Sequence, residues 1–492
     1  MKRINYKSAI ILTLVVGLLG VASCKKEFLD VNNNPNAPEK VDVKFALPSA
    51  ESYLGYTVGN QLALVGGFWG QYWTQGPNAN QYASLDQYIY NSADADRPWA
   101  ALYAGTLKDL QFIYETGTTK DSTKRNYAAI ARILQAYTYQ VITDAWGDVP
   151  FSESLKGDAD NVAPHFDSQE AVYDGILDMV DEGMSMLDPN FDSPGSDDLI
   201  YNGDLFLWYE FGNTLKLKIL LRQSEIRPSL AQTKISEMFT NGEPFIDMGE
   251  SARLYYADQK FQQSPLYTTG YALGTTSNIF GSSSAIDYLN NTNDPRVADF
   301  YAENGSGNFV GLQQGEGKLL GGNQSDGTWS KPNDQLVGPT ASTTLISDAE
   351  SKFLQAEAIV RGWGSGDEQA TYEAGIEASW STWAGSSELV ATDLATFLAS
   401  DSIAYPASGS TADKLKAILT QKWVAMTGNQ NFEAWTEFRR TGYPSFLQPS
   451  VTSVLGGGAF PARIVYPSDE VTSNTNFPGV KTVTVKVWWD AN

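Results

Sequence analysis

The chain has 492 residues, 42% hydrophobic and 18% charged, which is enough for a large folded core. Its 34 basic and 57 acidic side chains give a net charge of −23, which disfavours binding to nucleic acids and to anionic lipid headgroups. A single cysteine and a single histidine exclude intramolecular disulfides, Cys-rich zinc sites and sites with two imidazoles. Aromatic residues reach 12%, a surplus that core packing, ligand contact or both must explain.

Residues 1–23 are predicted to be a secretory signal peptide. Basic side chains at Lys2, Arg3 and Lys7 precede an apolar stretch, Ile10 to Gly20, that is too short to cross a membrane as a helix. The sequence Val21-Ala22-Ser23-Cys24 then resembles a bacterial lipobox, in which the cysteine thiol receives a diacylglyceryl anchor. Cleavage would remove three basic side chains and change the net charge from −23 to −26, so the lipid would hold the protein to a membrane.

Residues 24–40 are rich in Asn and Pro, which favour turns and extended chain, and they are predicted to form a lipidated tether. The folded domain is expected over residues 41–492. Within it, apolar residues recur at spacings of three and four from Tyr127 to Trp146, which predicts an amphipathic helix that stops at Gly147. Further helices are predicted over residues 172–187, 205–221, 351–361, 369–383, 414–426 and 432–440.

Short connections between successive helices predict helix pairs of the tetratricopeptide kind, with an irregular helical bundle as the alternative. Residues 242–343 and 441–487 are instead rich in Gly, Ser, Asn, Thr and Pro, and are predicted to be loop-rich insertions. Alternation over residues 481–487 predicts a strand near the C-terminus. The fold class is therefore mainly α: a single large domain in which tetratricopeptide-like helix pairs carry a long-loop, ligand-facing region.

Two segments are candidates for sugar binding, which needs flat aromatic faces together with amide or carboxylate groups for the hydroxyls. Residues 68–82 supply both, and a second Gly/Asn-rich loop contains another tryptophan. The predicted ligand-binding residues are Trp69, Tyr72, Trp73, Asn78, Asn80, Tyr82 and Trp329. Trp69 and Trp73 are four residues apart, so packing on one helix face is the alternative for them. Trp146, Trp208, Trp380, Trp423 and Trp435 are predicted to be scaffold residues.

A few residues are candidates for a catalytic or metal site, and each also has a structural explanation. Asp144 and Asp148 are the first candidates for the acid and base of a glycoside hydrolase, but a helix-terminal turn explains them as well. The only histidine, His165, lies beside a predicted helix cap. Residues 158–169 begin like a calcium-binding loop but lack its glycine and its final glutamate, so no cofactor is assigned. A structural calcium site built from oxygens that are distant in the sequence remains an alternative. No phosphate-binding loop motif occurs.

Several motifs resemble those of one family. They are Gln135–Gln140 with Thr143–Phe151, Leu354–Ala358 with Arg361-Gly362, Tyr372–Ile376, Gln421-Lys422-Trp423, Glu433-Ala434-Trp435 with Arg439–Gly442, and Pro461–Pro467 with Glu470 and Asn474. In this order and spacing they are similar to the SusD/RagB family of nutrient-binding outer-membrane lipoproteins.

The resemblance implies a lipoprotein anchored to the outer membrane through Cys24 that captures oligosaccharides, or peptides in some members, without catalysis. It also implies a partner, a SusC-like TonB-dependent outer-membrane channel that receives the ligand. Lys25-Lys26-Glu27 only partly matches the surface-export signal of such lipoproteins, so a position facing the exterior is a separate expectation. The alternatives are a secreted glycoside hydrolase and a scaffold that binds another protein.

Overall fold

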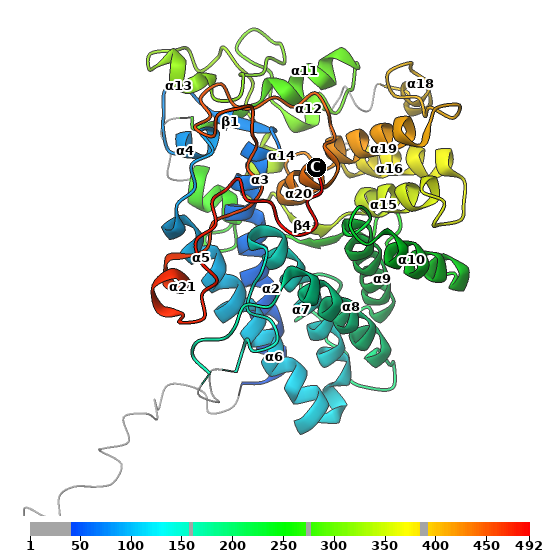
Figure 1. The fold of residues 1–492 in the computed structure, drawn as a ribbon. Coiled ribbons are helices and arrows are strands. Elements are labelled where there is room, and N and C mark those ends of the chain that lie inside the picture. Colours follow the sequence, from blue (N-terminus) through cyan, green and yellow to red (C-terminus); the bar gives the residue numbers. More distant parts are fainter. Residues whose placement is uncertain (1–40, 157–160, 272–276, 384–391) are drawn as a thin grey trace, which may run out of the picture. The chain divides into compact units, whose positions relative to one another are not determined.

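The computed structural model describes residues 41–156, 161–271, 277–383 and 392–492 (Figure 1). Contacts divide the chain after Asp42, and the folded unit is Val43–Asn492. The predicted signal peptide, the lipidation residue Cys24 and the tether lie outside the described residues, as do residues 158 and 160 of the calcium-loop candidate. These predictions therefore remain predictions.

The folded unit is mainly helical (Figure 1). Its α-helices and π- or 3₁₀-helical stretches (η) are α2 (Val43–Tyr56), η2 (Thr57–Leu62), α3 (Ala63–Trp69), α4 (Ala83–Asp86), α5 (Ser92–Ala100), η3 (Ala101–Leu107), α6 (Lys108–Glu115), η4 (Thr116–Lys120), η5 (Ser122–Lys124), α7 (Arg125–Trp146), α8 (Gln169–Met186), α9 (Leu205–Arg222), α10 (Pro228–Asn241), η7 (Tyr267–Tyr271), α11 (Ser283–Asn291), α12 (Val297–Phe300), α13 (Glu316–Leu320), α14 (Asp334–Val337), α15 (Asp348–Val360), α16 (Glu368–Trp383), α18 (Leu394–Leu398), α19 (Thr411–Ala425), α20 (Asn431–Thr441) and α21 (Ser468–Ser473). The strands β1 (Trp73–Gln75), β2 (Ala252–Leu254), β3 (Ile279–Gly281) and β4 (Thr343–Ile346) form two antiparallel pairs, β1–β3 and β2–β4.

Helix pairs form the scaffold, as the periodicity predicts. Helix α7 packs against α6 and α8, α9 lies between α8 and α10, and α15 contacts α16 and α19. Helix α7 is buried nearly all round and ends at Gly147, whose φ of 80° is a conformation that glycine adopts without strain. Helix α8 is capped at its N-terminus by Ser168, whose Oγ accepts a hydrogen bond from the amide of Ala171. The mainly α, helix-pair fold class is therefore confirmed.

A buried ionic cluster joins α9, α15, α19 and α20. Its members are Lys218, Arg222, Glu350, Glu357, Lys422, Glu433, Glu437 and Arg440, all with side chains less than one-tenth exposed. Lys218 Nζ lies 3.1 Å from a Glu350 oxygen and 3.0 Å from one of Glu433. Arg222 pairs with both Glu433 and Glu437, and Arg440 Nη2 lies 2.7 Å from Glu357 and from Glu437. Half of these charges, those of Glu357, Lys422, Glu433 and Arg440, lie in the sequence motifs that carry the family resemblance, so these motifs contribute to holding the helix pairs together.

The tryptophans predicted to be scaffold residues are buried. Trp146, Trp208 and Trp435 have no exposed surface, and Trp380 and Trp423 are also buried. The indole of Trp435 packs edge-on against Trp69 with 4.9 Å between ring centroids. Much of the aromatic surplus is therefore explained by core packing.

The predicted C-terminal strand over residues 481–487 is wrong, because this segment runs through turns. A strand needs a neighbouring strand along its whole length. The neighbouring segment offers only two backbone hydrogen bonds, from the amides of Ala462 and Arg463, and both go to the carbonyl of Val483. The segment is fixed instead by buried Val487 and Trp489, whereas Trp488 stays half-buried.

Candidate ligand-binding site

Three of the predicted ligand-binding residues lie in the core. Trp69, Tyr72 and Trp73 have no exposed surface. Tyr72 stacks on Trp423 with 4.8 Å between centroids, and its hydroxyl donates a 2.5 Å hydrogen bond to the Trp423 carbonyl. Trp69 Nε1 donates to the carbonyl of Leu85. These three side chains pack the scaffold and are not accessible to a ligand. Trp69 and Trp73 are buried as the alternative expects, but they do not share one helix face, because Trp69 ends α3 and Trp73 begins β1.

The other four predicted residues lie on two loops that contact each other; they are Asn78, Asn80, Tyr82 and Trp329. We call the surface formed by the two loops, residues 76–82 and 324–331, the loop face. Asn80 is exposed, Asn78 and Trp329 are half-buried, and Tyr82 is 9% exposed. The loop face sits at the upper left in Figure 1, beside β1, α4 and α13.

The pairing of β1 with β3 positions the first loop. Gln75 lies opposite Ile279, and the amide of Gly76 donates to the carbonyl of Asn278 at 2.8 Å. A Cβ atom at Gly76 would lie 2.4 Å from the ring of Phe280, closer than side-chain contacts allow. Glycine at this position therefore lets the loop lie directly on Phe280.

Asn78 ties the two loops together. Its Nδ2 donates to the carbonyl of Gln324 and to Oδ1 of Asp326, both at 2.8 Å, and its Oδ1 accepts from the amide of Gln324 at 3.0 Å. Asp326 also accepts from Ser277 Oγ at 3.0 Å and lies 3.6 Å from Lys331 Nζ. Against the effect of partial burial, the hydrogen bonds from Asn78 and Ser277 lower the pKa of Asp326, so this carboxylate is ionised at neutral pH.

Trp329 provides the aromatic surface. Its ring stands edge-on to the buried ring of Phe280, with 6.3 Å between centroids, and Lys331 Nζ lies 5.3 Å from the Phe280 centroid. The indole is thus supported from below while part of it remains exposed. A half-exposed indole beside amide and carboxylate groups offers a sugar both a stacking face and hydrogen-bond partners.

Asp86, which the sequence analysis did not single out, supports the loop face from beneath. It accepts hydrogen bonds from Thr74 Oγ at 2.9 Å, from the amide of Gln75 at 2.8 Å and from Gln314 Nε2. Burial raises the pKa of Asp86 to about 7 in spite of these donors. A lone aspartate has no sequence signal for this role, because Gln314 is distant along the chain.

The residues weighed for catalysis have structural roles. Asp144 is 1% exposed and accepts hydrogen bonds from the Tyr173 hydroxyl at 2.5 Å and from Trp489 Nε1 at 2.8 Å. Asp148 Oδ1 accepts from the amide of Gln169 at the start of α8, at 2.8 Å. His165 Nδ1 lies 3.0 Å from Glu153 on the surface. In the described ranges, no group of three or more His, Cys, Asp or Glu side chains could hold a metal ion.

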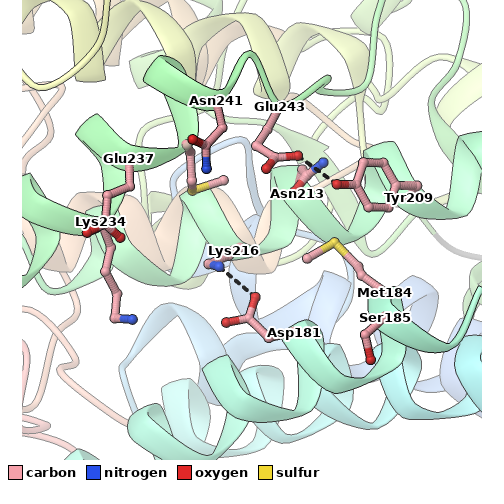
Figure 2. Close-up of a pocket in the computed structure, with 11 residues that line it drawn as sticks. Asp181, Met184, Ser185, Tyr209, Asn213, Lys216, Lys234, Glu237, Asn241 and Glu243 are labelled. Carbon is pink, nitrogen blue, oxygen red and sulfur yellow. Dashed lines mark hydrogen bonds and ion pairs between the residues drawn. The ribbon is translucent and has the colours of Figure 1, made fainter.

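A separate polar pocket lies between α8, α9 and α10 and has a volume of about 290 Å³ (Figure 2). The residues that line this pocket pair with one another: Lys216 Nζ lies 2.5 Å from Asp181, and the Tyr209 hydroxyl donates a hydrogen bond to Glu243 at 2.7 Å. A neutral sugar would have to compete with these charged interactions, so this pocket suits it less well than the loop face does.

Comparisons with known proteins agree on the fold. A SusD homologue from Bacteroides uniformis has a TM-score of 0.77 and 24% identity over 91% of this chain and 100% of its own. A chitin-binding SusD homologue from Flavobacterium johnsoniae has a TM-score of 0.76 and 22% identity over 92% of this chain and 99% of its own. Another structure, named a chitin-binding protein, has a TM-score of 0.76 and 25% identity over 90% of this chain and 100% of its own. No curated protein matches the chain.

Within the part of the chain that the structure describes, no helix is long and apolar enough to cross a membrane. A SusD-like family model, described as "Starch-binding associating with outer membrane", matches residues 35–467. The match covers most of the chain and includes the motifs of the buried ionic cluster. The chain therefore belongs to the SusD-like family of outer-membrane-associated binding proteins.

Proposed function

We propose that this protein binds oligosaccharides on its loop face and does not cleave them. The observation that carries the proposal is that Asn78 joins the loop of the exposed Asn80 to the loop of Trp329 through hydrogen bonds to Gln324 and the ionised Asp326, while the tryptophans of the scaffold are buried. The family description and the two chitin-binding relatives support a glycan rather than a peptide as the ligand class.

The protein would act at the outer membrane. Cys24 would carry the lipid anchor, and residues 25–40 would tether the folded domain so that it faces the exterior. A SusC-like TonB-dependent channel would then accept the bound oligosaccharide. The lipobox and the family assignment support this arrangement.

Calorimetric titration tests the binding proposal. The lipid-free domain is titrated with malto-oligosaccharides, chito-oligosaccharides and, as the competing ligand class, short peptides. We expect one of the glycan series to bind, and the Trp329→Ala variant to bind at least tenfold more weakly, because the indole supplies the stacking surface. Trp363→Ala is the matched control, since Trp363 is also half-buried but lies between α15 and α16.

Binding of peptides with no binding of either glycan series would contradict the glycan assignment. Equal losses in Trp329→Ala and Trp363→Ala would contradict the loop face as the site. Release of shortened products on long incubation with the bound glycan would contradict the non-catalytic role. For the channel, affinity purification of the full-length protein from its native outer membrane should recover a β-barrel partner, and its absence would contradict that part.

A further inference from the structure

A large groove lies along α2, apart from the polar pocket of Figure 2. It has a volume of about 1070 Å³ and is lined by α2, by Leu199 and by residues 254–268. This volume is at the upper end of what binding sites for small ligands occupy, and it leaves room for more than one sugar ring.

The groove carries two of the most exposed aromatic side chains of the described residues. Phe261 is 90% exposed and Tyr255 is 73% exposed, and both line the groove. Phe261 also has a φ of 73°, the left-handed region that a bulky side chain rarely adopts. A protein normally buries such rings, so their joint exposure at a hollow points to a ligand.

Polar groups are interspersed with these rings. Ser52, Lys260 and Gln262 are exposed in the lining, and Thr268 closes one end. Behind them, the hydroxyls of Tyr256 and Thr343 lie 3.2 Å apart and fix the wall. Aromatic faces together with hydroxyl and amide groups suit the two sides of a pyranose ring, and a hollow of this volume suits a sugar chain better than the flat surface of a folded protein.

The groove adjoins the loop face through η7. Thr268 lines the groove, and two residues later Gly270 lies against Tyr82, because a Cβ atom there would be 3.0 Å from the Tyr82 hydroxyl. The Cα atoms of Thr268 and Gly270 can be at most about 7 Å apart. Thr269 is held in place by Asn60 Nδ2, which donates to its hydroxyl at 2.9 Å. The end of the groove is thus close to Tyr82, one of the residues of the loop face.

We infer that the groove is a second platform for the same glycan, so that the protein prefers long oligosaccharides that contact both Trp329 and the Tyr255–Phe261 pair. The inference rests on the proposed function, because it assumes that the loop face binds a glycan. It adds the prediction that chain length sets the affinity. A disaccharide would contact only one platform, whereas a hexasaccharide would contact both and gain from the second contact as a linked ligand does.

The test compares chain lengths by calorimetry. The probes are maltose and maltohexaose, and diacetylchitobiose and chitohexaose, on the wild type and on Tyr255→Ala/Phe261→Ala. We expect the wild type to bind the hexasaccharide of one series at least tenfold more tightly than its disaccharide. The double variant should lose this gain and keep its affinity for the disaccharide. Phe206→Ala is the control, since Phe206 is 59% exposed but does not line the groove.

The results separate the two proposals. A length gain that persists in the double variant would overturn the second platform and leave the loop face standing. Unchanged glycan affinities with loss of the channel partner on purification would show that the groove docks a protein instead. Failure of the wild type to bind either series would overturn both proposals for these glycans. Because both rings are exposed, the double variant should unfold at the wild-type temperature, which a melting curve by circular dichroism checks.

Discussion

The pKa of a buried carboxyl group is shifted in opposite directions in the buried ionic cluster and beneath the loop face. In the cluster, Arg440, Lys422 and Arg222 surround Glu437 and, against the effect of burial, hold the pKa of its carboxyl well below the usual range. Beneath the loop face, Asp86 is bound by the neutral groups of Thr74, Gln75 and Gln314, and burial raises its pKa to about 7. The first carboxylate stabilises the scaffold when ionised, whereas ionisation of the second lowers the stability of the folded state because burial opposes its charge.

This contrast shows how the chain divides its charges between stability and binding. The charges of the buried ionic cluster are paired with one another and are unavailable to a ligand. The accessible polar groups, such as Asn80 and Asp326, lie instead on loops that the β1–β3 pairing and the hydrogen bonds of Asn78 hold in place. Motif residues therefore identify the family, and loop residues are expected to set the ligand.

The largest effect is expected from breaking the cluster. Glu437→Gln would leave Arg222, Lys422 and Arg440 facing one another without their shared carboxylate. Loss of one partner of a buried ionic group costs roughly 3 to 5 kcal/mol in the free energy of unfolding. Urea denaturation followed by circular dichroism measures this cost.

The control is Glu115→Gln, which removes one partner of an exposed ion pair with Lys120 at 3.7 Å. An exposed pair contributes less than about 1 kcal/mol. If the two variants lose similar stability, the cluster does not hold the scaffold in the way described.

A smaller and pH-dependent effect is expected at Asp86. Its pKa is about 7 when folded and near 3.8 when unfolded, so the folded state binds more protons between these values. The stability of the wild type should therefore fall relative to Asp86→Asn as the pH rises from 4 to 7, by about 3 kcal/mol. Urea denaturation across this pH range tests it, and parallel stability curves for the two proteins would contradict the raised pKa.

The smallest effect is expected from Asn78→Ala, which removes the hydrogen bonds from one loop to Gln324 and Asp326. The lost pre-organisation should weaken glycan binding about threefold to tenfold, since such bonds contribute about 1 kcal/mol. Calorimetry measures the change. Asn190→Ala removes a comparable surface bond, to Asp188 at 2.7 Å, and should leave affinity unchanged; a loss as large as in Asn78→Ala would refute the link.

The helix pairs could be predicted because their signal is local. The periodic apolar residues from Tyr127 to Trp146 predict α7 to within two residues of its observed start at Arg125. Strands β1 to β4 have three or four residues each and give no periodic signal, so they escaped prediction. The alternating C-terminal segment gave a false signal, because alternation does not supply a neighbouring strand.

The site could be predicted only in part. Composition selected Asn78 and Trp329, which the structure brings to one surface, but it could not separate them from Tyr72 and Trp69. Those two are buried by Trp423 and Trp435, more than 350 residues away along the chain. The exposure of Phe261 likewise depends on how its loop lies against α2, which no local pattern encodes.

Hydrogen–deuterium exchange with a bound glycan tests the central claim most directly. The wild-type domain is measured with and without a saturating amount of the tightest-binding malto- or chito-oligosaccharide. The account predicts slower exchange of backbone amides in residues 76–82 and 324–331, with little change in α8, α9 and α10. Slower exchange confined to those three helices, or no change on the loop face at saturation, would contradict it.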